Sequence, residues 1–296
     1  KKSLNLITLI ANFIQKTYKL FIGGKFPRTE SGRSYSIEND KGALIANMCH
    51  ASRKDFRNSV VVARKAQAGW AGKTAFNRSQ ILYRLAEMLE ARSASFSEEI
   101  QLLGSSKSDA DKEVVDAIDT LVYYAGWCDK YTALFSSVNP TASAHFNFTV
   151  HEPTGVVAAV APEQNGLLGL VQIIAPIICG GNTTVVLASN TMGTSAISFA
   201  EVVQNSDVPG GVINILTGVM SELTPHMASH MDVNALVIAR IGLSDESRDA
   251  VIENVKRFAD WSTSEVDSNP YRILDFQEAK STWHPVQTST GGVSGY

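Results

Sequence analysis

The chain has 296 residues, of which 44% are hydrophobic and 19% charged, and its glycine and proline contents are those of ordinary globular proteins. This composition excludes disorder, collagen and coiled coil for most of the length, and so long a chain folds without disulfides or a structural metal. The formal net charge of -3 gives no general attraction to phosphate backbones or anionic lipids, so neither nucleic acid nor a membrane is expected as a partner.

The first apolar segment, Leu4 to Ile14, follows two lysines and has apolar residues at helical spacing. It reaches about half the length of a membrane span and lacks a small-residue cleavage site, so we expect an amphipathic helix packed on the body. The three cysteines are too few and too widely spaced for a disulfide framework or a zinc ribbon, which favours a reducing, cytoplasmic location. The chain begins with Lys rather than Met, which is typical of a fragment or a processed product.

Residues 1–140 are expected to be mainly helical. Residues 19–25 predict a short hairpin, with Gly23 and Gly24 in the turn. Three helical patterns follow: one from the N-cap Ser52 to Trp70, one over residues 81–89, and one from Ser108 or Asp109 towards Phe135. None of these helices carries a titratable cluster that requires a chemical role.

Residues 141–258 change to a strand pattern. In residues 146–150, apolar side chains alternate with polar ones, which predicts a half-buried strand. Unbroken apolar strands then alternate with helices: strands at 156–160, 183–187, 212–216 and 235–239, and helices at 167–178, 194–203 and 222–229. This pattern predicts a doubly wound, Rossmann-like α/β fold with a parallel sheet, which binds nucleotides beyond the carboxyl ends of its strands.

The alternation ends at Phe258. Residues 260–269 are polar and predict a linker, residues 272–285 contain a further strand, and a Ser/Thr/Gly tail follows. The expected organisation is therefore a helical part at 1–140, a Rossmann-like part at 141–258, and a linker with a terminal strand at 259–296.

Motifs for independent chemistry are weak. The sequence has no Gly-x-Gly-x-x-Gly fingerprint and no phosphate loop. His226 and His230 lie four residues apart, but a solvated pair at a helix end is favoured over a metal site, and no metal is expected. Asp109, Asp111 and Glu113 form a charged helix start that suits the helix dipole.

The cysteines are interpreted as structural. Cys179 closes an apolar helix, where burial would raise the pKa of its thiol and make it inert. Cys49 and Cys128 lie in the helical part, with His50 as the only neighbouring histidine.

From His151 onward the sequence resembles the cofactor-binding domain of the aldehyde dehydrogenase superfamily. The resemblance is carried by an ordered series of motifs: Glu152-Pro-Thr-Gly-Val156, Pro162, Leu167-Leu168, Ala175-Pro176, Gly181-Asn182-Thr183, Val208-Pro-Gly-Gly-Val-Ile-Asn-Ile-Leu-Thr-Gly218 and Ser229-His-Met-Asp-Val233. Residues 19–70 also fit the amino-terminal region of that family, so the resemblance covers nearly all of residues 19–258.

The departures from the family pattern fall where the family performs its chemistry. Gln164 stands in place of the Asn that helps to hold the oxyanion, and its extra methylene displaces the donor. Leu187 and Asn190 stand in place of the Lys and Glu that hold the cofactor ribose. Arg240 stands in place of a glycine at the pyrophosphate turn, where it blocks close backbone approach but could attract an anion. All four are therefore degenerate positions.

The resemblance also implies that the catalytic domain is absent, because the catalytic Cys and general-base Glu of the family belong after this region. Residues 276–285 are similar to the family's carboxy-terminal strand, which pairs with a neighbouring subunit. This arrangement resembles the truncated second half of the family 16 aldehyde dehydrogenases, in which a dehydrogenase unit precedes a degenerate copy.

Three hypotheses follow. The first is a pseudoenzyme module with a small β oligomerisation arm, assembling as a homo-oligomer or with a dehydrogenase domain through exposed edges at residues 146–150 and 279–283. The second is an NAD(P)-binding regulatory domain; under the first hypothesis no cofactor is expected, and NAD would bind only weakly. The third is aldehyde oxidation, either with Cys179 as a new nucleophile or by an upstream NAD-dependent unit of the same polypeptide.

Overall fold

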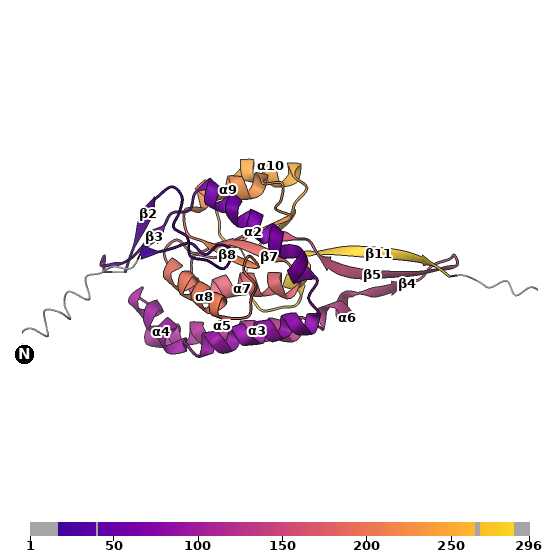
Figure 1. Ribbon diagram of the computed structural model, residues 1–296, viewed down its shortest axis with the longest axis horizontal. Coiled ribbons are helices and arrows are strands. Elements are labelled where there is room, and N and C mark those ends of the chain that lie inside the picture. The colour runs from indigo at the N-terminus through magenta and orange to yellow at the C-terminus, as the bar shows by residue number, and fades with distance from the viewer. Residues whose placement is uncertain (1–16, 40, 264–266, 287–296) are drawn as a thin grey trace, which may run out of the picture.

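The computed structural model describes residues 17–39, 41–263 and 267–286, and a five-stranded parallel sheet lies at its centre (Figure 1). The strand order is β10-β9-β6-β7-β8. The strands are β6 (Val156–Val160), β7 (Thr183–Leu187), β8 (Ile213–Leu216), β9 (Ala235–Ile238) and β10 (Arg257–Asp260). The helix predicted at residues 4–14 and most of the terminal tail lie outside the described residues.

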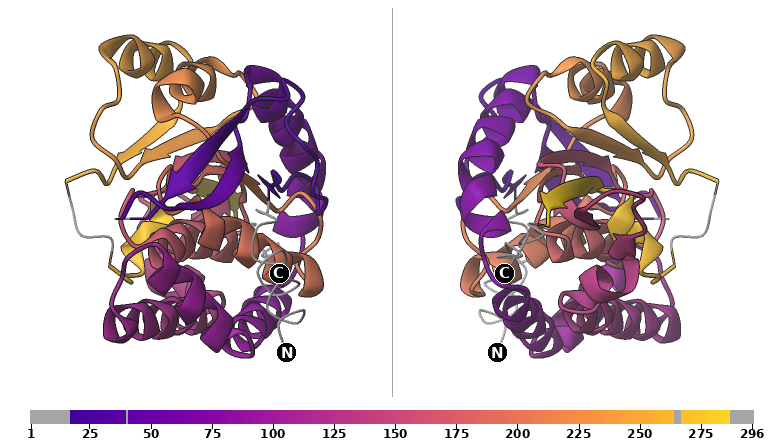
Figure 2. Two further views of the ribbon diagram at one scale, coloured as in Figure 1. Left: turned by 90° about the vertical axis from the view of Figure 1, so that its left-hand side faces the viewer. Right: turned by 90° about the vertical axis from the view of Figure 1, so that its right-hand side faces the viewer.

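Helices cover both faces of this sheet, which confirms the doubly wound prediction. Figures 1 and 2 show α7 and α8 on one face, and α2, α9 and α10 on the other. A further layer, α3, α4 and α5, packs outside α7 and α8. The bounds are α2 Arg53–Ala71, α3 Ala75–Glu90, α4 Ser93–Leu102, α5 Lys107–Trp127, α7 Gly166–Cys179, α8 Gly193–Asn205, α9 Met220–Ser229 and α10 Asp245–Glu253.

The hydrophobic core has two parts, one on each side of the sheet. Successive strand residues point to opposite faces, so Val157 and Ala159 join the part beneath α7 and α8. Val156, Ala158 and Val160 join the part beneath α2 and α9. Because β6 and β7 are buried along their whole lengths, their sequences show unbroken apolar runs rather than alternation.

The amino-terminal region closes over one end of the sheet. Strands β1 (Thr17–Tyr18), β2 (Ser34–Glu38) and β3 (Leu44–Cys49) form a small sheet of order β1-β3-β2. The predicted hairpin at residues 19–25 is a tight turn with one bridge, between Ile22 and Lys25, and both turn glycines have positive φ. The predicted helix at Ser52 is confirmed as α2, and Ser52 caps it in a capping box with Asp55.

The third predicted helix, from residue 108 to 135, is two helices. α5 ends at Trp127, and α6 (Tyr131–Phe135) follows after a turn. Short-range bonds make this turn: the Cys128 N–H donates to the Ala125 carbonyl, and the Lys130 N–H donates to the Trp127 carbonyl. Helix α4 was not expected, because its ten residues have a weak apolar stripe.

The sheet also extends past residue 258. Helix α10 and strand β10 add a further helix–strand unit, and β10 pairs in parallel with β9. As an edge strand with every second residue exposed, β10 lacks the apolar run of its neighbours. The boundary expected at residue 258 therefore falls inside a strand.

A three-stranded antiparallel arm extends from the body (Figure 1). Its order is β11-β5-β4, built from β4 (Ser137–Asn139), β5 (His145–Pro153) and β11 (Gln277–Pro285), and the short helix α11 (Tyr271–Leu274) precedes β11. The strand expected at residues 279–283 is thus present. The expectation of a free edge at residues 146–150 is wrong, because β5 is the central strand and pairs on both sides.

The two faces of the arm differ in polarity. Val138, Phe146 and Phe148 share one face, and the exposed fractions of Val138 and Phe146 are 68% and 46%. On the other face, Asn147 is buried and accepts a hydrogen bond from the Asn139 amide. In the strand predicted from the alternation, the apolar Phe146 is therefore exposed and the polar Asn147 is buried, while Phe148 and Thr149 are both half-buried.

Charged side chains accompany the pairing of β5 with β11. Glu278 lies directly opposite Glu152, an arrangement that repels by itself. Arg257 compensates the charge of Glu278 at 2.9 Å, and Lys280 forms an ion pair with Glu152.

Within the described residues, no helix combines the length and apolar character needed to cross a bilayer.

Candidate functional site

The carboxyl ends of β6, β7 and β9 are where a doubly wound sheet binds a nucleotide. Three loops meet there. Glu163 follows β6, Ser189 and Thr191 follow β7, and Arg240 follows β9. The neighbouring parallel strands β6, β7 and β9 bring these segments together.

The Arg240 guanidinium is buried across this end of the sheet. Its Nε donates to the carbonyl oxygen of Ala161 beyond β6, and its Nη2 donates to the carbonyl oxygen of Ala188 beyond β7. The third nitrogen, Nη1, lies 2.8 Å from Glu163 Oε2, and only 10% of the side chain is exposed. Each guanidinium nitrogen is therefore already engaged by the chain itself.

Glu163 is held equally firmly. Its Oε1 accepts hydrogen bonds from the Thr191 backbone N–H at 2.8 Å, from Thr191 Oγ1 at 2.9 Å and from Ser189 Oγ at 3.1 Å. Burial alone would raise the pKa of Glu163, but Arg240 and the Thr191 hydrogen bonds outweigh it and hold the pKa below its usual value. Glu163 is thus an anion fixed beside a buried cation.

The Arg240–Glu163 pair leaves no place for a cofactor phosphate. A phosphate that approached Arg240 would have to displace the Glu163 carboxylate, which is itself bound by Thr191. The anion that Arg240 holds in this structure is the carboxylate of Glu163.

The other degenerate positions also do not fit a dinucleotide. Leu187 is fully buried in the core beneath α2 and α9. Gln164 is exposed, and its side chain has no hydrogen bond to the residues that the structure describes. Asn190 Oδ1 is buried without a partner among those residues, but one short amide cannot replace the Lys and Glu pair that grips a ribose, because Leu187 supplies no polar group. These three side chains therefore do not supply the contacts that hold a dinucleotide in the family.

The amino-terminal end of α7 is occupied as well. The backbone N–H groups of Leu167 and Leu168 donate to Glu113 Oε1 at 2.9 and 3.2 Å. A helix N-terminus in this position can bind an anion from solution, but here a carboxylate from α5 takes the site. Burial raises the pKa of Glu113, while these two hydrogen bonds oppose the rise. Glu113 was expected on a charged helix start, whereas it is buried and caps a neighbouring helix.

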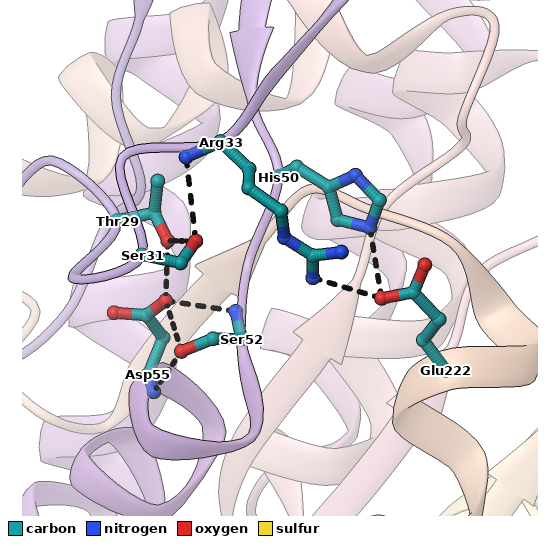
Figure 3. Close-up of polar contacts among 7 residues, drawn as sticks. All are labelled: Thr29, Ser31, Arg33, His50, Ser52, Asp55 and Glu222. Carbon is teal, nitrogen blue, oxygen red and sulfur yellow. Dashed lines mark hydrogen bonds and ion pairs between the residues drawn. The ribbon is translucent and has the colours of Figure 1, made fainter.

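A second polar cluster lies where α2 begins and α9 approaches it (Figure 3). Asp55 Oδ2 accepts hydrogen bonds from Thr29 Oγ1 at 2.6 Å and from Ser52 N at 2.8 Å. Beside it, Glu222 of α9 pairs with Arg33 at 2.8 Å and with His50 at 3.3 Å. These contacts tie the small amino-terminal sheet to α2 and α9.

The remaining titratable candidates do not form a site. His226 lies on α9 and His230 caps it, and the part of the chain that the structure describes has no group of three metal-ligating side chains. Burial lowers the pKa of both histidines. Cys179 is fully buried at the end of α7. It lies at the end of the sheet where the parallel strands begin, whereas the Arg240–Glu163 pair lies where they end.

Sequence reasoning missed Glu163, Glu113 and Thr191. For Glu163 a signal existed, because an acid and a base, Glu163 and Arg240, both appear at departures from the family pattern, after adjacent strands. For Glu113 there was none, because nothing local distinguishes a buried carboxylate from a solvated one on an amphipathic helix.

The sequence profile described as the aldehyde dehydrogenase family matches residues 26–239. A putative aldehyde dehydrogenase DhaS of Bacillus subtilis is 30% identical over 77% of this chain and 46% of its own length. Retinal dehydrogenase 2 of Gallus gallus is 32% identical over 75% of this chain and 43% of its own. Mouse cytosolic 10-formyltetrahydrofolate dehydrogenase is 31% identical over 75% of this chain and 25% of its own.

The solved structures agree on the fold. An NAD+ complex of aldehyde dehydrogenase from Bacillus cereus has a TM-score of 0.78 at 23% identity, covering 85% of this chain and 52% of that one. A putative aldehyde dehydrogenase from Burkholderia cenocepacia has the same score at 25% identity, covering 82% and 50%. The chain thus spans about half the length of these relatives, or less.

Proposed function

The chain belongs to the aldehyde dehydrogenase family, and we propose that these residues form a non-catalytic module whose function is assembly with another dehydrogenase subunit. Under this proposal, any aldehyde oxidation by a polypeptide that carries the module is performed by a complete dehydrogenase unit in another part of that polypeptide.

One observation carries the proposal. The Arg240–Glu163 pair fills the carboxyl end of the sheet, and all three guanidinium nitrogens are engaged there. Glu113 takes the N-terminus of α7 in the same way. A site whose cation and helix N-terminus are both neutralised internally offers little free energy to an incoming pyrophosphate.

The arm supports assembly. The outer edge of β11 has no partner strand among the described residues, and its backbone groups can pair with a strand of another subunit. One face of the arm carries the apolar side chains Val138, Phe146 and Phe148, and burying them against a partner would stabilise the assembly. The partner is a second copy of this chain or a dehydrogenase domain.

Calorimetric titration tests whether the chain has lost the ability to bind the cofactor. We expect no heat of binding for NAD or NADP at millimolar concentration, where a dissociation constant of about 1 mM corresponds to roughly 4 kcal/mol. The matched control is Arg240→Gly, which restores the family residue and removes the pair. Binding by the unaltered chain at sub-millimolar cofactor would refute the proposal and favour an NAD(P)-binding regulatory domain.

Native mass measurement tests the assembly. Phe146→Asp places a charge on the apolar face of the arm without opening the core, and we expect it to reduce the oligomer mass of the full chain. Deleting residues 271–296 should do the same by removing β11. Phe76→Asp is the control, because Phe76 is a similar exposed apolar residue, 67% accessible, on α3. An unchanged mass in both arm variants would remove the assembly role.

A further inference from the structure

Two cysteines from distant parts of the chain lie in contact in the core. Cys128 Sγ is 3.6 Å from Cys179 Sγ, and both side chains are fully buried. Cys128 directly follows α5, and Cys179 is the last residue of α7. The third cysteine, Cys49, belongs to the core on the opposite side of the sheet.

We propose that Cys128 and Cys179 are an oxidisable pair that closes to a disulfide and locks α5 to α7 at the base of the arm. This inference does not depend on the proposed function. A disulfide needs a sulfur–sulfur distance of about 2.0 Å, so the two sulfur atoms must approach by roughly 1.5 Å. Both residues end helices beside turns, and Gly180 and Gly181 follow Cys179, so the backbone can adjust at this point.

A buried cation lies beside the pair. Arg78 is 7% exposed; its Nε donates to the Cys179 carbonyl at 3.2 Å and its Nη1 donates to the Lys73 carbonyl. None of the described carboxylates forms an ion pair with it. Burial, the neighbouring Cys128 and the charge of Asp129 raise the pKa of Cys179, and Arg78 acts against that rise. The Cys179 thiol is therefore protonated at neutral pH, and its thiolate, which Arg78 faces, becomes more abundant as the pH rises.

A small peroxide supplies the oxidation, because only a small oxidant reaches a buried sulfur. The Cys179 thiolate attacks one peroxide oxygen and breaks the O–O bond, giving a sulfenic acid and, after protonation, one water. The Cys128 thiol then attacks the Cys179 sulfur, the S–S bond forms, and the second oxygen leaves as water. Two thiols and one hydrogen peroxide thus yield one disulfide and two waters, with both electrons transferred to the peroxide.

The position of the pair connects it to the arm. Gly180, the residue after Cys179, accepts a hydrogen bond from Gln277 Nε2 at 3.0 Å, and Gln277 is the first residue of β11. The Tyr124 hydroxyl, four residues before Cys128, donates to the Asn269 carbonyl. A bond between the two sulfurs joins these anchors and limits the local opening that would release β11.

Peptide mapping tests the proposal. The full folded chain is treated with hydrogen peroxide over a pH series, unfolded, alkylated and digested. We expect a peptide that links Cys128 to Cys179 and is lighter by two hydrogens, while Cys49 stays alkylated. The Cys49→Ser variant should form the same link at the same rate, and the link should form faster at higher pH.

A second readout is hydrogen exchange of the arm before and after oxidation, with slower exchange expected in residues 277–285. The wild-type map decides the question even if Cys128→Ser fails to fold. The proposal is overturned if both thiols remain free at every peroxide concentration that leaves the chain folded. Links through Cys49, or sulfinic acids without a link, would also overturn it.

Discussion

Glu163→Gln isolates the charge of the pair at the end of the sheet. Glutamine retains an acceptor for Thr191, but it leaves Arg240, whose side chain is 10% exposed, without its counter-ion. Breaking a buried pair in this way costs about 3–5 kcal/mol. Glu163 is 31% exposed, so solvent screens part of the loss, and we expect about 2 kcal/mol of destabilisation.

Arg240→Met completes a double-mutant cycle. This variant leaves the carbonyls of Ala161 and Ala188 without their donor, at about 1 kcal/mol each, and it also unpairs Glu163. In the double variant the unpaired charge is gone, so its destabilisation should be smaller than the sum of the two single values by about 1–2 kcal/mol.

Urea unfolding at neutral pH gives the unfolding free energy of the wild type, the two single variants and the double variant, with each midpoint converted through a common m-value. The control cycle uses the exposed pair Arg84 and Glu87, whose side chains are 52% and 65% accessible, and should give a coupling below about 0.5 kcal/mol. Additive effects at Glu163 and Arg240 would show that the two groups do not act as a unit, and the reasoning about the closed cofactor site would fail.

Three more predictions concern stability. Val255 has φ +50 and ends α10 where glycine is favoured, so Val255→Gly should raise the unfolding free energy by about 1 kcal/mol, and a lower midpoint would contradict this. The lowered pKa of Glu163 makes its contribution to stability full at neutral pH and lost as the pH falls through that lowered value, so acid titration should narrow the stability gap between wild type and Glu163→Gln; a constant gap would contradict this. Because burial raises the pKa of Glu113, its charge opposes folding at neutral pH, and that contribution fades as the pH falls towards the usual range of a carboxyl. Thermal unfolding should therefore find Glu113→Gln at least as stable as wild type at pH 7, whereas Glu113→Ala, which unpairs the Leu167 N–H, should be about 2 kcal/mol less stable.

Much of the fold could be predicted because local pattern and burial agree. The strands at 156–160 and 183–187 match the structure because both faces are covered, so the apolar run marks each strand directly. The edge strand β10 could not be predicted in this way, since an exposed edge tolerates Arg257 and Asp260.

The site was less predictable, for a physical reason. The four degenerate positions could be located by comparing motifs residue by residue, but their partners depend on tertiary contacts. Arg240 and Glu163 are 77 residues apart in the chain and meet only because β9 lies beside β6. Similarly, the apolar alternation in β5 indicated a strand correctly, but it could not reveal that Phe146 would be exposed and Asn147 buried.

The charges on β11 have a consequence for solubility. A long strand with an open edge is a template for indiscriminate stacking into fibres. Glu278 and Lys280 interrupt that template, because each carries a charge that a stacked copy would have to bring beside its own kind. They act as gatekeepers, so the edge accepts a partner that supplies opposite charges in register and repels an identical strand laid in parallel.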